Sequence, residues 1–530
     1  MTYQRTILIT GATDGIGLAL AQQYQAQGER PLLLGRKPWT ELPHLAEQFT
    51  SAMYCQADLT HPDASDRLTA FLAEQGVDRL DLIIHNAGIV YHGEFGAQTP
   101  EEIVSVLAVN LYAPIALTRT LLPWLPAGRG QVVFIGSVAA DVPGPDYAVY
   151  VASKAALIGL VRGLNAEWRG QVTVQLIQPG ATRSGMHAKM GLSLAQMNWE
   201  KFPPAAQVAG QIRRAIEGKR PFTTIGFPNR LISFVGRHFA FALDPAMRRA
   251  RRAPAQPIQP IQPTNQPTQP ATPPTCVISG AADGIGKALA RRFAQAGYSI
   301  IGLDIAAEQA LECLAELGEL GGDVTFILAD LSTVEGVETA VAQLSQGGPI
   351  DLFVHNAGIS AVGPFARLSP ARQQQVLDLN LRAPLRLTAA LAANGRFSPN
   401  ASFIFLGSLS TFVGYPGAAV YAASKDGLAA YARSLRVALG RSGQVLTVFP
   451  GPTRTAHARR YSPDNGREAR RMPPEQLAEG IFHAFQQRQT LYIPGPGNRL
   501  FALMGRLLPR LMDTMMFRLL YTPLRGRTLE

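Results

Sequence analysis

Cysteine is scarce in this sequence: only Cys55, Cys276 and Cys313 occur among 530 residues. They are too far apart to suggest a disulfide framework, and they form no cluster with metal-ligand spacing. We therefore expect a protein of a reducing compartment that binds no metal.

Long apolar segments are also lacking, since no stretch of about 18 uncharged apolar residues is present. A membrane-spanning helix is therefore not expected. Thr6–Thr10 (TILIT) reads as a first β-strand that runs straight into a glycine loop, so we expect no signal peptide. Together these absences predict a cytoplasmic protein.

The sequence does contain enough apolar material for two large domains. With 47% hydrophobic and 16% charged residues, a chain of 530 residues fits two domains of roughly 100–250 residues each. Residues 245–274 are rich in proline and glutamine and poor in large apolar side chains, which predicts a disordered linker. We predict an N-terminal domain over residues 1–244 and a C-terminal domain over residues 275–530.

The main motifs occur twice, in the same order. Gly11 recurs as Gly280, and Tyr150 recurs as Tyr421, so the two copies stay in step along the sequence. An offset that is long and nearly constant indicates two homologous domains rather than a solenoid, whose repeats are about 20–50 residues long.

A glycine loop follows the first predicted strand of each half. The loops read TGATDGIG at residues 10–17 and SGAADGIG at residues 279–286, each between a β-type run and a helical segment. Glycine permits a tight turn and a close approach to a pyrophosphate, and the following helix N-terminus attracts the phosphate charge. A single loop of this kind also occurs for packing alone, but its duplication in register favours dinucleotide binding. The loop residues assigned to the coenzyme are Gly11, Thr13, Gly15, Ile16 and Gly17 in the first half, and Gly280, Asp283, Gly284, Ile285 and Gly286 in the second.

The second predicted strand ends differently in the two halves. Gly35 of the first half and Asp304 of the second lie at the same sequence distance from the last glycine of their own loop. Arg36 follows Gly35. A carboxylate there accepts hydrogen bonds from both ribose hydroxyls and repels a 2′-phosphate, whereas an arginine attracts the phosphate. We therefore predict NADP(H) for the N-terminal domain and NAD(H) for the C-terminal domain. The alternative for Arg36 is a solvated surface charge.

Four polar residues with complementary chemistry recur in each half. A tyrosine hydroxyl ionises near pH 10, so a lysine one helical turn later can favour the phenolate and make the tyrosine a usable acid or base. A serine that precedes the tyrosine at the same spacing in both halves can polarise a substrate oxygen, and an upstream asparagine can anchor a water that relays protons. Hydride transfer would belong to the nicotinamide. The predicted catalytic residues are Asn110, Ser137, Tyr150 and Lys154 in the first half, and Asn380, Ser408, Tyr421 and Lys425 in the second.

Taken together, these motifs resemble those of the short-chain dehydrogenase/reductase family, over nearly the whole chain apart from the linker. The resemblance implies an α/β fold: two Rossmann-like, doubly wound domains in tandem, each with a seven-stranded parallel sheet flanked by helices. His85 and His355 stand where the family usually has an asparagine, and we interpret both as structural. The resemblance also implies coenzyme contacts from the ADL, HNAG and PG motifs of each half. These residues are Asp58, Leu59, Asn86, Gly88, Pro179, Gly180 and Thr182, and Asp330, Leu331, Asn356, Gly358, Pro450, Gly451 and Thr453.

The segments expected to close over substrate differ between the halves. Residues 185–202 are apolar and rich in methionine, which suits a lipid-like substrate. Residues 456–472 carry five arginines against two acidic residues, which suits a carboxylate, a phosphate or a carrier-bound substrate. The alternative for the second segment is a solvated, mobile loop.

Each half ends in a basic amphipathic tail, one beginning at Gly226 and the other at Gly495. We expect most of the apolar face of these tails to pack on the domain, with peripheral contact to an anionic membrane surface as the alternative. The net charge of +11 does not indicate nucleic-acid binding, because the arginines lie in tails and a loop without interleaved aromatic residues.

The predicted function is a bifunctional NAD(P)-dependent oxidoreductase that interconverts secondary alcohols and ketones. Oxidation at the NAD site followed by reduction at the NADPH site would epimerise or relocate a hydroxyl, and the linker would raise the effective concentration of the second site. The alternative is one active half with the other a scaffold or coenzyme sensor. The resemblance further implies that the two halves pair as an internal pseudo-dimer through the helices that carry Tyr150 and Tyr421.

Overall fold

The computed structural model describes residues 4–188, 199–239, 243–244, 246–247, 273–319, 323–440, 442–466, 468–524 and 527–530. Most of the predicted linker, and most of the predicted substrate segment 185–202, lie outside the described residues. The chain groups into two compact units. Unit 1 comprises Met1–His92, Glu101–Val142 and Val149–Leu243; unit 2 comprises Gly93–Pro100, Pro143–Ala148 and Asp244–Glu530.

The first half of the chain forms a seven-stranded parallel sheet in the order β3-β2-β1-β4-β5-β6-β7. Its strands are β1 (Thr6–Thr10), β2 (Arg30–Gly35), β3 (Tyr54–Gln56), β4 (Leu82–His85), β5 (Gln131–Ile135), β6 (Thr173–Gln178) and β7 (Phe222–Thr224). Its helices are α1 (Gly15–Gln25), α2 (Pro43–Ala46), α3 (Ala64–Glu74), α4 (Pro100–Leu107), α5 (Ala113–Leu121), α6 (Ala148–Glu167), α7 (Gly185–Ala188), α8 (Ala205–Glu217) and α9 (Phe227–His238).

The second half repeats this topology in the order β10-β9-β8-β11-β12-β13-β14. Its strands are β8 (Thr275–Ser279), β9 (Ser299–Asp304), β10 (Val324–Leu328), β11 (Ile350–His355), β12 (Phe397–Leu406), β13 (Val445–Val448) and β14 (Leu491–Tyr492). Its helices are α11 (Gly284–Gln295), α12 (Ala307–Glu319), α13 (Val334–Leu344), α14 (Pro370–Leu377), α15 (Ala383–Ala393), α16 (Ala419–Leu439), α17 (Ala456–Tyr461), α18 (Pro474–Gln486), α19 (Pro496–Leu507) and α20 (Pro509–Met516). The predicted fold class, two doubly wound α/β domains in tandem, is confirmed.

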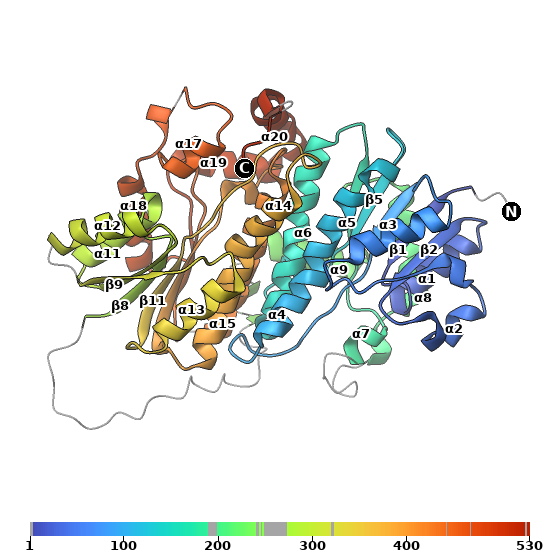
Figure 1. Cartoon of the computed structure of the whole chain (residues 1–530), viewed down its shortest axis with the longest axis horizontal. Helices are drawn as coiled ribbons and strands as arrows, with labels where there is room; N and C mark the ends of the chain where they lie inside the picture. The colour runs from blue at the N-terminus through green and yellow to red at the C-terminus, as the bar shows by residue number, and fades with distance from the viewer. Residues whose placement is uncertain are drawn as a thin grey trace. The chain divides into compact units, whose positions relative to one another are not determined.

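The central strands are short apolar runs because helices cover both of their faces. β1 and β8 are buried after their first residue, as expected for parallel strands inside such a sheet. In Figure 1, α11 and α18 lie on one side of the second sheet, and α13 and α15 lie on the other. The core of each half therefore forms between the sheet and its helices.

The strand order reverses between β1 and β4, and again between β8 and β11. In an open α/β sheet, ligands bind in the crevice at the carboxyl ends of the strands where the order reverses. The glycine loops follow β1 and β8, and the HNAG motifs follow β4 and β11. The topology thus brings these two motifs together in each half.

Two helical stretches, Pro100–Trp124 and Pro145–Glu167, are long and apolar enough to cross a membrane by length and composition. Most of each stretch is buried inside the protein, as in the core helices of a globular domain.

Helices α9 and α19 bury small residues and expose several large ones, whereas α20 buries Met512 and Met516. The buried residues of α9 are Ser233 and Gly236, and those of α19 are Ala502 and Gly505. A Cβ on Gly505 would lie 2.3 Å from the carbonyl oxygen of Phe412, so only glycine allows this close approach. The prediction that most of the apolar face packs is therefore confirmed only in part, because Met504, Met515 and Met516 pack in a cluster with Phe412 and Phe449 whereas the leucines of α19 are exposed. The large apolar side chains left exposed are Phe227, Leu231, Ile232 and Phe234 on α9, and Leu500, Leu503, Leu507, Leu508 and Leu511 on and after α19.

Replacement of Gly286 by alanine should destabilise unit 2 by roughly 1–3 kcal/mol, as expected for overpacking. The added Cβ would lie 1.8 Å from the carbonyl oxygen of Gly280, a backbone atom that cannot rotate away. Gly318→Ala is the matched control, because this helical glycine has no neighbour within 4 Å and should gain up to about 1 kcal/mol. Urea unfolding of both variants checks the prediction, and equal stabilities would contradict it.

Candidate active sites

Each glycine loop is closed by contacts that leave no room for a side chain. Gly11 and Gly280 have φ of +63° and +67°, a conformation that favours glycine. A Cβ on Gly17 would lie 2.2 Å from the carbonyl oxygen of Gly11. The first turn of α1 therefore packs directly on the loop, and its N-terminus faces the crevice as a phosphate site requires.

Asn86 and Asn356 hold these loops in place. The Asn86 amide donates to the carbonyl oxygens of Thr10 and Gly11 at 3.1 and 3.0 Å. The Asn356 amide donates to those of Ser279 and Gly280 at 3.0 and 2.9 Å. Both asparagines are predicted to contact coenzyme, and in this structure their amide nitrogens bind the backbone of the glycine loop.

The two ribose positions differ as the sequence predicts. In the second half, Asp304 Oδ2 accepts a hydrogen bond from the loop amide of Ala282 at 2.9 Å, which places this carboxylate beside the glycine loop. In the first half, a Cβ on Gly35 would lie 2.5 Å from the Thr13 side chain, so threonine occupies that space. Arg36 and Lys37, both exposed, are cations that follow directly.

The ADL aspartates turn the chain at the same end of the sheet. Asp58 accepts hydrogen bonds from Thr60 N and Oγ1 at 2.9 and 2.8 Å. Burial raises the pKa of Asp58, but the hydrogen bonds from Thr60 and the nearby charge of Arg36 outweigh it and lower the pKa. Asp330 makes the equivalent bonds to Ser332. Both aspartates are thus turn-forming residues, and Asp58 lies near enough to Arg36 to feel its charge.

The lysines of the tetrads are buried beneath the crevice. Lys154 Nζ donates to the carbonyl oxygen of Ile135 at 3.0 Å, and Lys425 Nζ donates to that of Leu406 at 2.9 Å. Each Nζ lies 5.9 Å from the ring centre of its tyrosine, Tyr150 or Tyr421. Burial lowers the pKa of both lysines to about 8.

The tetrad asparagines lie in a π-helical turn between two α-helices of each half, at Ala108–Tyr112 and Asp378–Arg382. π-Helical turns of this kind frequently occur at functional sites. Asn110 Oδ1 accepts from Ile89 N, and Asn110 Nδ2 donates to Ile89 O, both at 2.9 Å. A Cβ on Gly88 would lie 3.3 Å from Lys154 Nζ and 3.5 Å from Asn110 Oδ1. The glycine, the asparagine and the lysine therefore meet, as the sequence predicts.

The serines begin short 3-10 turns, where Ser137 Oγ accepts from Ala139 N at 3.1 Å and Ser408 Oγ accepts from Ser410 N at 3.2 Å. Burial raises the pKa of Tyr421, and its hydrogen bond with Ser408 lowers it only in part. The expected shift toward phenolate is therefore wrong for Tyr421 in this structure. Its hydroxyl is held protonated, which is the form that can donate a proton to a carbonyl oxygen.

His85 and His355 are buried core residues, in agreement with their interpretation as structural. Their Nε2 atoms share hydrogen bonds with Thr118 Oγ1 at 2.8 Å and Thr388 Oγ1 at 3.0 Å. The His85 ring stacks on Phe134, and burial lowers the pKa of both histidines to about 3. They are neutral at physiological pH.

Two asparagines that the sequence analysis missed support the PG motifs. Gly180 and Gly451 pack against the side chains of Asn229 and Asn498, and a Cβ at either glycine would lie within 2.6 Å of them. Thr182 donates to the carbonyl oxygen of Gly180 at 3.0 Å, and Thr453 makes the equivalent bond. The signal was available as the NRL triplet repeated near the start of both tails.

The arginine-rich segment after the second PG motif is bound mainly to itself. Arg459 pairs with Glu468 at 2.9 Å. Arg471 donates to Ser462 Oγ, to Asp464 O and to Asn465 Oδ1 at 2.9, 3.1 and 2.7 Å. These two arginines therefore bind groups of their own loop, although the Arg459 side chain is still half exposed to solvent. Arg467 lies outside the described residues.

Comparisons with known proteins agree with the fold and the motifs. The sequence model for short chain dehydrogenase matches residues 5–194 and again residues 274–466. The uncharacterized short-chain type dehydrogenase/reductase y4vI of Sinorhizobium fredii is 25% identical over 86% of this chain and 83% of its own length. Oxidoreductase UcpA of Salmonella typhimurium is 33% identical over 39% of this chain and 83% of its own.

Among solved structures, an N-terminal ketoreductase from a macrolactin assembly line has a TM-score of 0.60. The match covers 95% of this chain and 90% of that chain at 13% sequence identity. At this identity, the similarity is one of fold.

Lys154→Met should make unit 1 more stable at pH 7, by roughly 1–3 kcal/mol. Because burial lowers the lysine pKa from 10.5 to about 8, protonation costs more in the folded than in the unfolded state. The wild-type protein should lose stability as the pH falls from about 10.5 to 8, and the variant should not. Urea unfolding at pH 7 and 10.5 checks this, with the exposed Lys37→Met as control. A variant less stable than wild type at pH 7 would contradict the prediction.

Proposed function

This chain belongs to the short chain dehydrogenase family, and we propose that it interconverts secondary alcohols and ketones at two sites, one in each half. The observation that supports two sites rather than one is the equivalence of the tetrad geometries. The lysine-to-tyrosine distance is 5.9 Å in both halves, and both lysines bind a backbone carbonyl. If one half had become a scaffold or a coenzyme sensor, this buried polar arrangement would have no chemical role there.

We assign a nicotinamide coenzyme to the crevice of each half, because the helix that follows each glycine loop begins in close contact with the loop backbone, at Gly17 and Gly286, as a pyrophosphate site requires. Such a coenzyme, when bound, would supply or accept the hydride. The first site is assigned NADP(H), supported by Arg36 and Thr13, and the second NAD(H), supported by the Asp304 carboxylate.

The residues of the chain would handle the substrate oxygen and the proton. In ketone reduction, Tyr421 donates its proton to the carbonyl oxygen while the Ser408 hydroxyl hydrogen-bonds that oxygen. Lys425 then supplies positive charge near the phenolate that forms, and a water held by the adjacent asparagine would return the proton. Alcohol oxidation uses the same steps in reverse, and Tyr150, Ser137 and Lys154 have the same roles in the first half.

The two sites are proposed to act in sequence on one substrate. Oxidation at the NAD site followed by reduction at the NADPH site would invert or relocate a hydroxyl without a net change in oxidation state. The linker supports this proposal because it keeps the second site at a high effective concentration. Pairing of the halves as an internal pseudo-dimer, through helices α6 and α16, is proposed on the family resemblance.

Single tyrosine variants separate the two activities. Tyr150→Phe should lower NADPH-linked ketone reduction at least about 100-fold and leave NAD-linked alcohol oxidation unchanged, and Tyr421→Phe should do the reverse, because each removes one acid. Initial rates with a panel of secondary alcohols and ketones check this. Tyr147→Phe is the matched control, since this tyrosine lies in neither tetrad. A half whose tyrosine can be changed with no loss of any turnover would be a scaffold.

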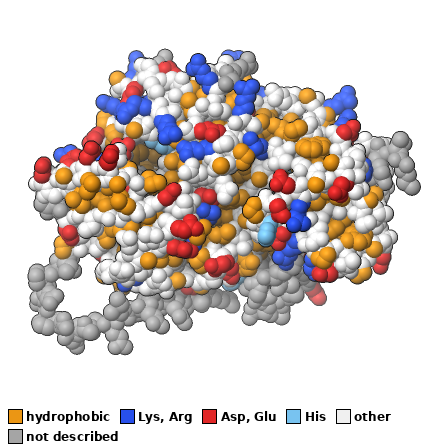
Figure 2. Space-filling model, in the orientation of Figure 1, with side chains coloured by type: hydrophobic (Ala, Val, Ile, Leu, Met, Phe, Trp, Pro, Cys, Tyr) orange, Lys and Arg blue, Asp and Glu red, His pale blue; other side chains and the backbone are white. Residues whose placement is uncertain are grey.

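We also propose that the tails bind the surface of an anionic bilayer. The exposed leucines of α19 and α20 lie among Arg499, Arg510 and Arg518, which are exposed as well. Figure 2 shows basic side chains gathered over the region of α17 and α20. Apolar side chains flanked by arginines suit the interface between acyl chains and anionic headgroups.

The double change Leu503→Ser and Leu507→Ser should reduce co-sedimentation with phosphatidylserine-containing vesicles at least about 10-fold, because it removes two exposed leucines from the inserted face. Leu311→Ser is the matched control, since it removes an equally exposed leucine from α12. Binding of wild-type protein should also weaken as salt is raised. Equal binding of wild type and the double variant would contradict the proposal.

A further inference from the structure

The last described residues of the chain, Arg527–Glu530, lie across the loop that follows the second HNAG motif. Leu529 pairs with Val362 in an antiparallel bridge: Val362 N donates to Leu529 O at 3.0 Å, and Leu529 N donates to Val362 O at 2.6 Å. Val362 lies a few residues after Gly358, in the same loop. A Cβ added to Gly358 would lie 3.3 Å from Lys425 Nζ. This segment, named here the strap, is therefore fastened to the same loop that contacts the tetrad.

A glycine makes the close approach of the strap possible. A Cβ on Gly363 would lie 2.9 Å from the Thr528 side chain and 3.0 Å from its Cα. At the equivalent Gly93 of the first half, the nearest described atom is Gln98 Cγ at 3.8 Å. Among the residues that the structure describes, none approaches Gly93 as closely as Thr528 approaches Gly363.

Apolar side chains next to the strap pack around the catalytic tyrosine. Leu524 is only 1% exposed and forms a cluster with Val362 and Tyr461, against which Tyr421 and Leu529 pack. The ring of Tyr415 lies beside that of Tyr421, 6.3 Å between centres, and burial raises the pKa of Tyr415 to about 12. Tyr421 is therefore packed against an apolar wall to which Leu529 of the strap contributes.

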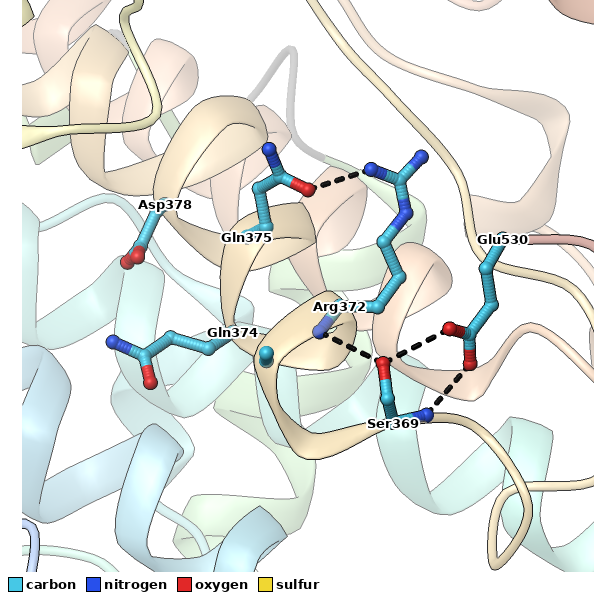
Figure 3. A pocket seen from close by; sticks show the side chains of 7 residues that line it. Ser369, Arg372, Gln374, Gln375, Asp378 and Glu530 are labelled. Carbon is cyan, nitrogen blue, oxygen red and sulfur yellow. Dashed lines mark hydrogen bonds between the residues drawn. The ribbon is translucent and has the colours of Figure 1, made fainter.

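The outer end of the strap is held by polar bonds at the surface. Glu530 accepts from Ser369 N at 2.6 Å and from Ser369 Oγ at 2.9 Å, at the N-terminus of α14, where negative charge is favourable. These two residues are among those that line an open pocket of about 560 Å³ on α14, and Figure 3 shows their hydrogen bonds. Arg460 also donates to the Glu530 backbone oxygen at 2.8 Å. Water competes for such exposed bonds, so they can be broken and remade readily.

We propose that residues 527–530 are a specificity-determining strap, which covers the substrate side of Tyr421 and limits the second site to compact alcohols and ketones. The substrate class in this proposal rests on the proposed function, but whether the strap covers Tyr421 can be tested without turnover. Bulkier substrates would require the strap to leave Val362 and Ser369. At the first site, no described residue covers the equivalent Gly93 in this way, so the limit is proposed for the second site alone.

The first test measures how accessible the Tyr421 side chain is to a reagent in solution, and it requires no catalytic reaction. In the full-length protein, deletion of residues 527–530 should raise the rate of Tyr421 nitration by tetranitromethane at least about 10-fold, read by peptide mass spectrometry. Tyr150 serves as the internal control and should not change. Because a deletion can perturb folding, Glu530→Ala is the second variant and should give a smaller increase in the same direction, whereas Glu308→Ala, an exposed acid on α12, should give none. Unchanged nitration of Tyr421 in both strap variants would overturn the proposal.

The second test measures specificity. For NAD-linked oxidation, the deletion should lower KM at least about 10-fold for secondary alcohols with a bulky substituent, and less than about twofold for compact ones, with kcat little changed. NADPH-linked reduction at the first site should be unaffected. If the deletion makes Tyr421 more accessible to nitration but leaves the ratio of KM values for bulky and compact alcohols unaltered, the specificity role is overturned. Absence of any alcohol turnover in wild type, with nitration behaving as expected, would instead contradict the proposed function.

Discussion

The contact between the ends of two neighbouring strands governs the rest of each site. At the carboxyl ends of β1 and β4, one asparagine amide donates to two carbonyl groups of the glycine loop. This amide ties the loop to the strand that carries the HNAG motif, and Gly17 then lets α1 pack on the loop without a side chain between them. The glycine loop and the glycine beside Lys154 are therefore held in one arrangement, which recurs at Asn356.

A second constraint is the burial of a cation beneath each crevice. Lys154 and Lys425 each have a backbone carbonyl as a hydrogen-bond partner, and burial lowers their pKa to about 8. Keeping a lysine in such a place reduces the stability of the folded protein at neutral pH. The same buried charge is what can stabilise a tyrosinate during proton transfer. Stability is thus given up at the position where catalysis needs charge, as is common in active sites.

The two halves share the arrangement of glycine loop, asparagine and buried lysine, and they differ in the side chains around it. Asp304 stands where the first half has Gly35, and the side chain of Thr13 occupies the corresponding space there. In the second half, Tyr415, Leu524 and Leu529 pack in the same apolar cluster as Tyr421. Two sites with the same loop and tetrad arrangement but different surrounding side chains are suited either to two reactions of one intermediate or to two different substrates.

Much of this protein is determined by local sequence patterns. The duplication, the two sheets and the meeting of Asn110 with Lys154 follow from motifs whose spacing reflects the strand and helix geometry itself. A glycine loop after a strand and a lysine one turn after a tyrosine lead to the same local structure wherever the parallel sheet forms. For that reason the predicted fold and the convergence of these residues could be derived without coordinates.

Only the tertiary structure decided the remaining features, because they depend on which distant segments meet. The hydrophobic periodicity of α19 predicts an apolar face, but it does not say that Ala502 and Gly505 form the packed side while Leu503 and Leu507 stay exposed. Composition likewise marks residues 456–472 as basic without showing that Arg459 is neutralised by Glu468. The partners of a side chain are set by long-range packing, which periodicity and composition do not encode.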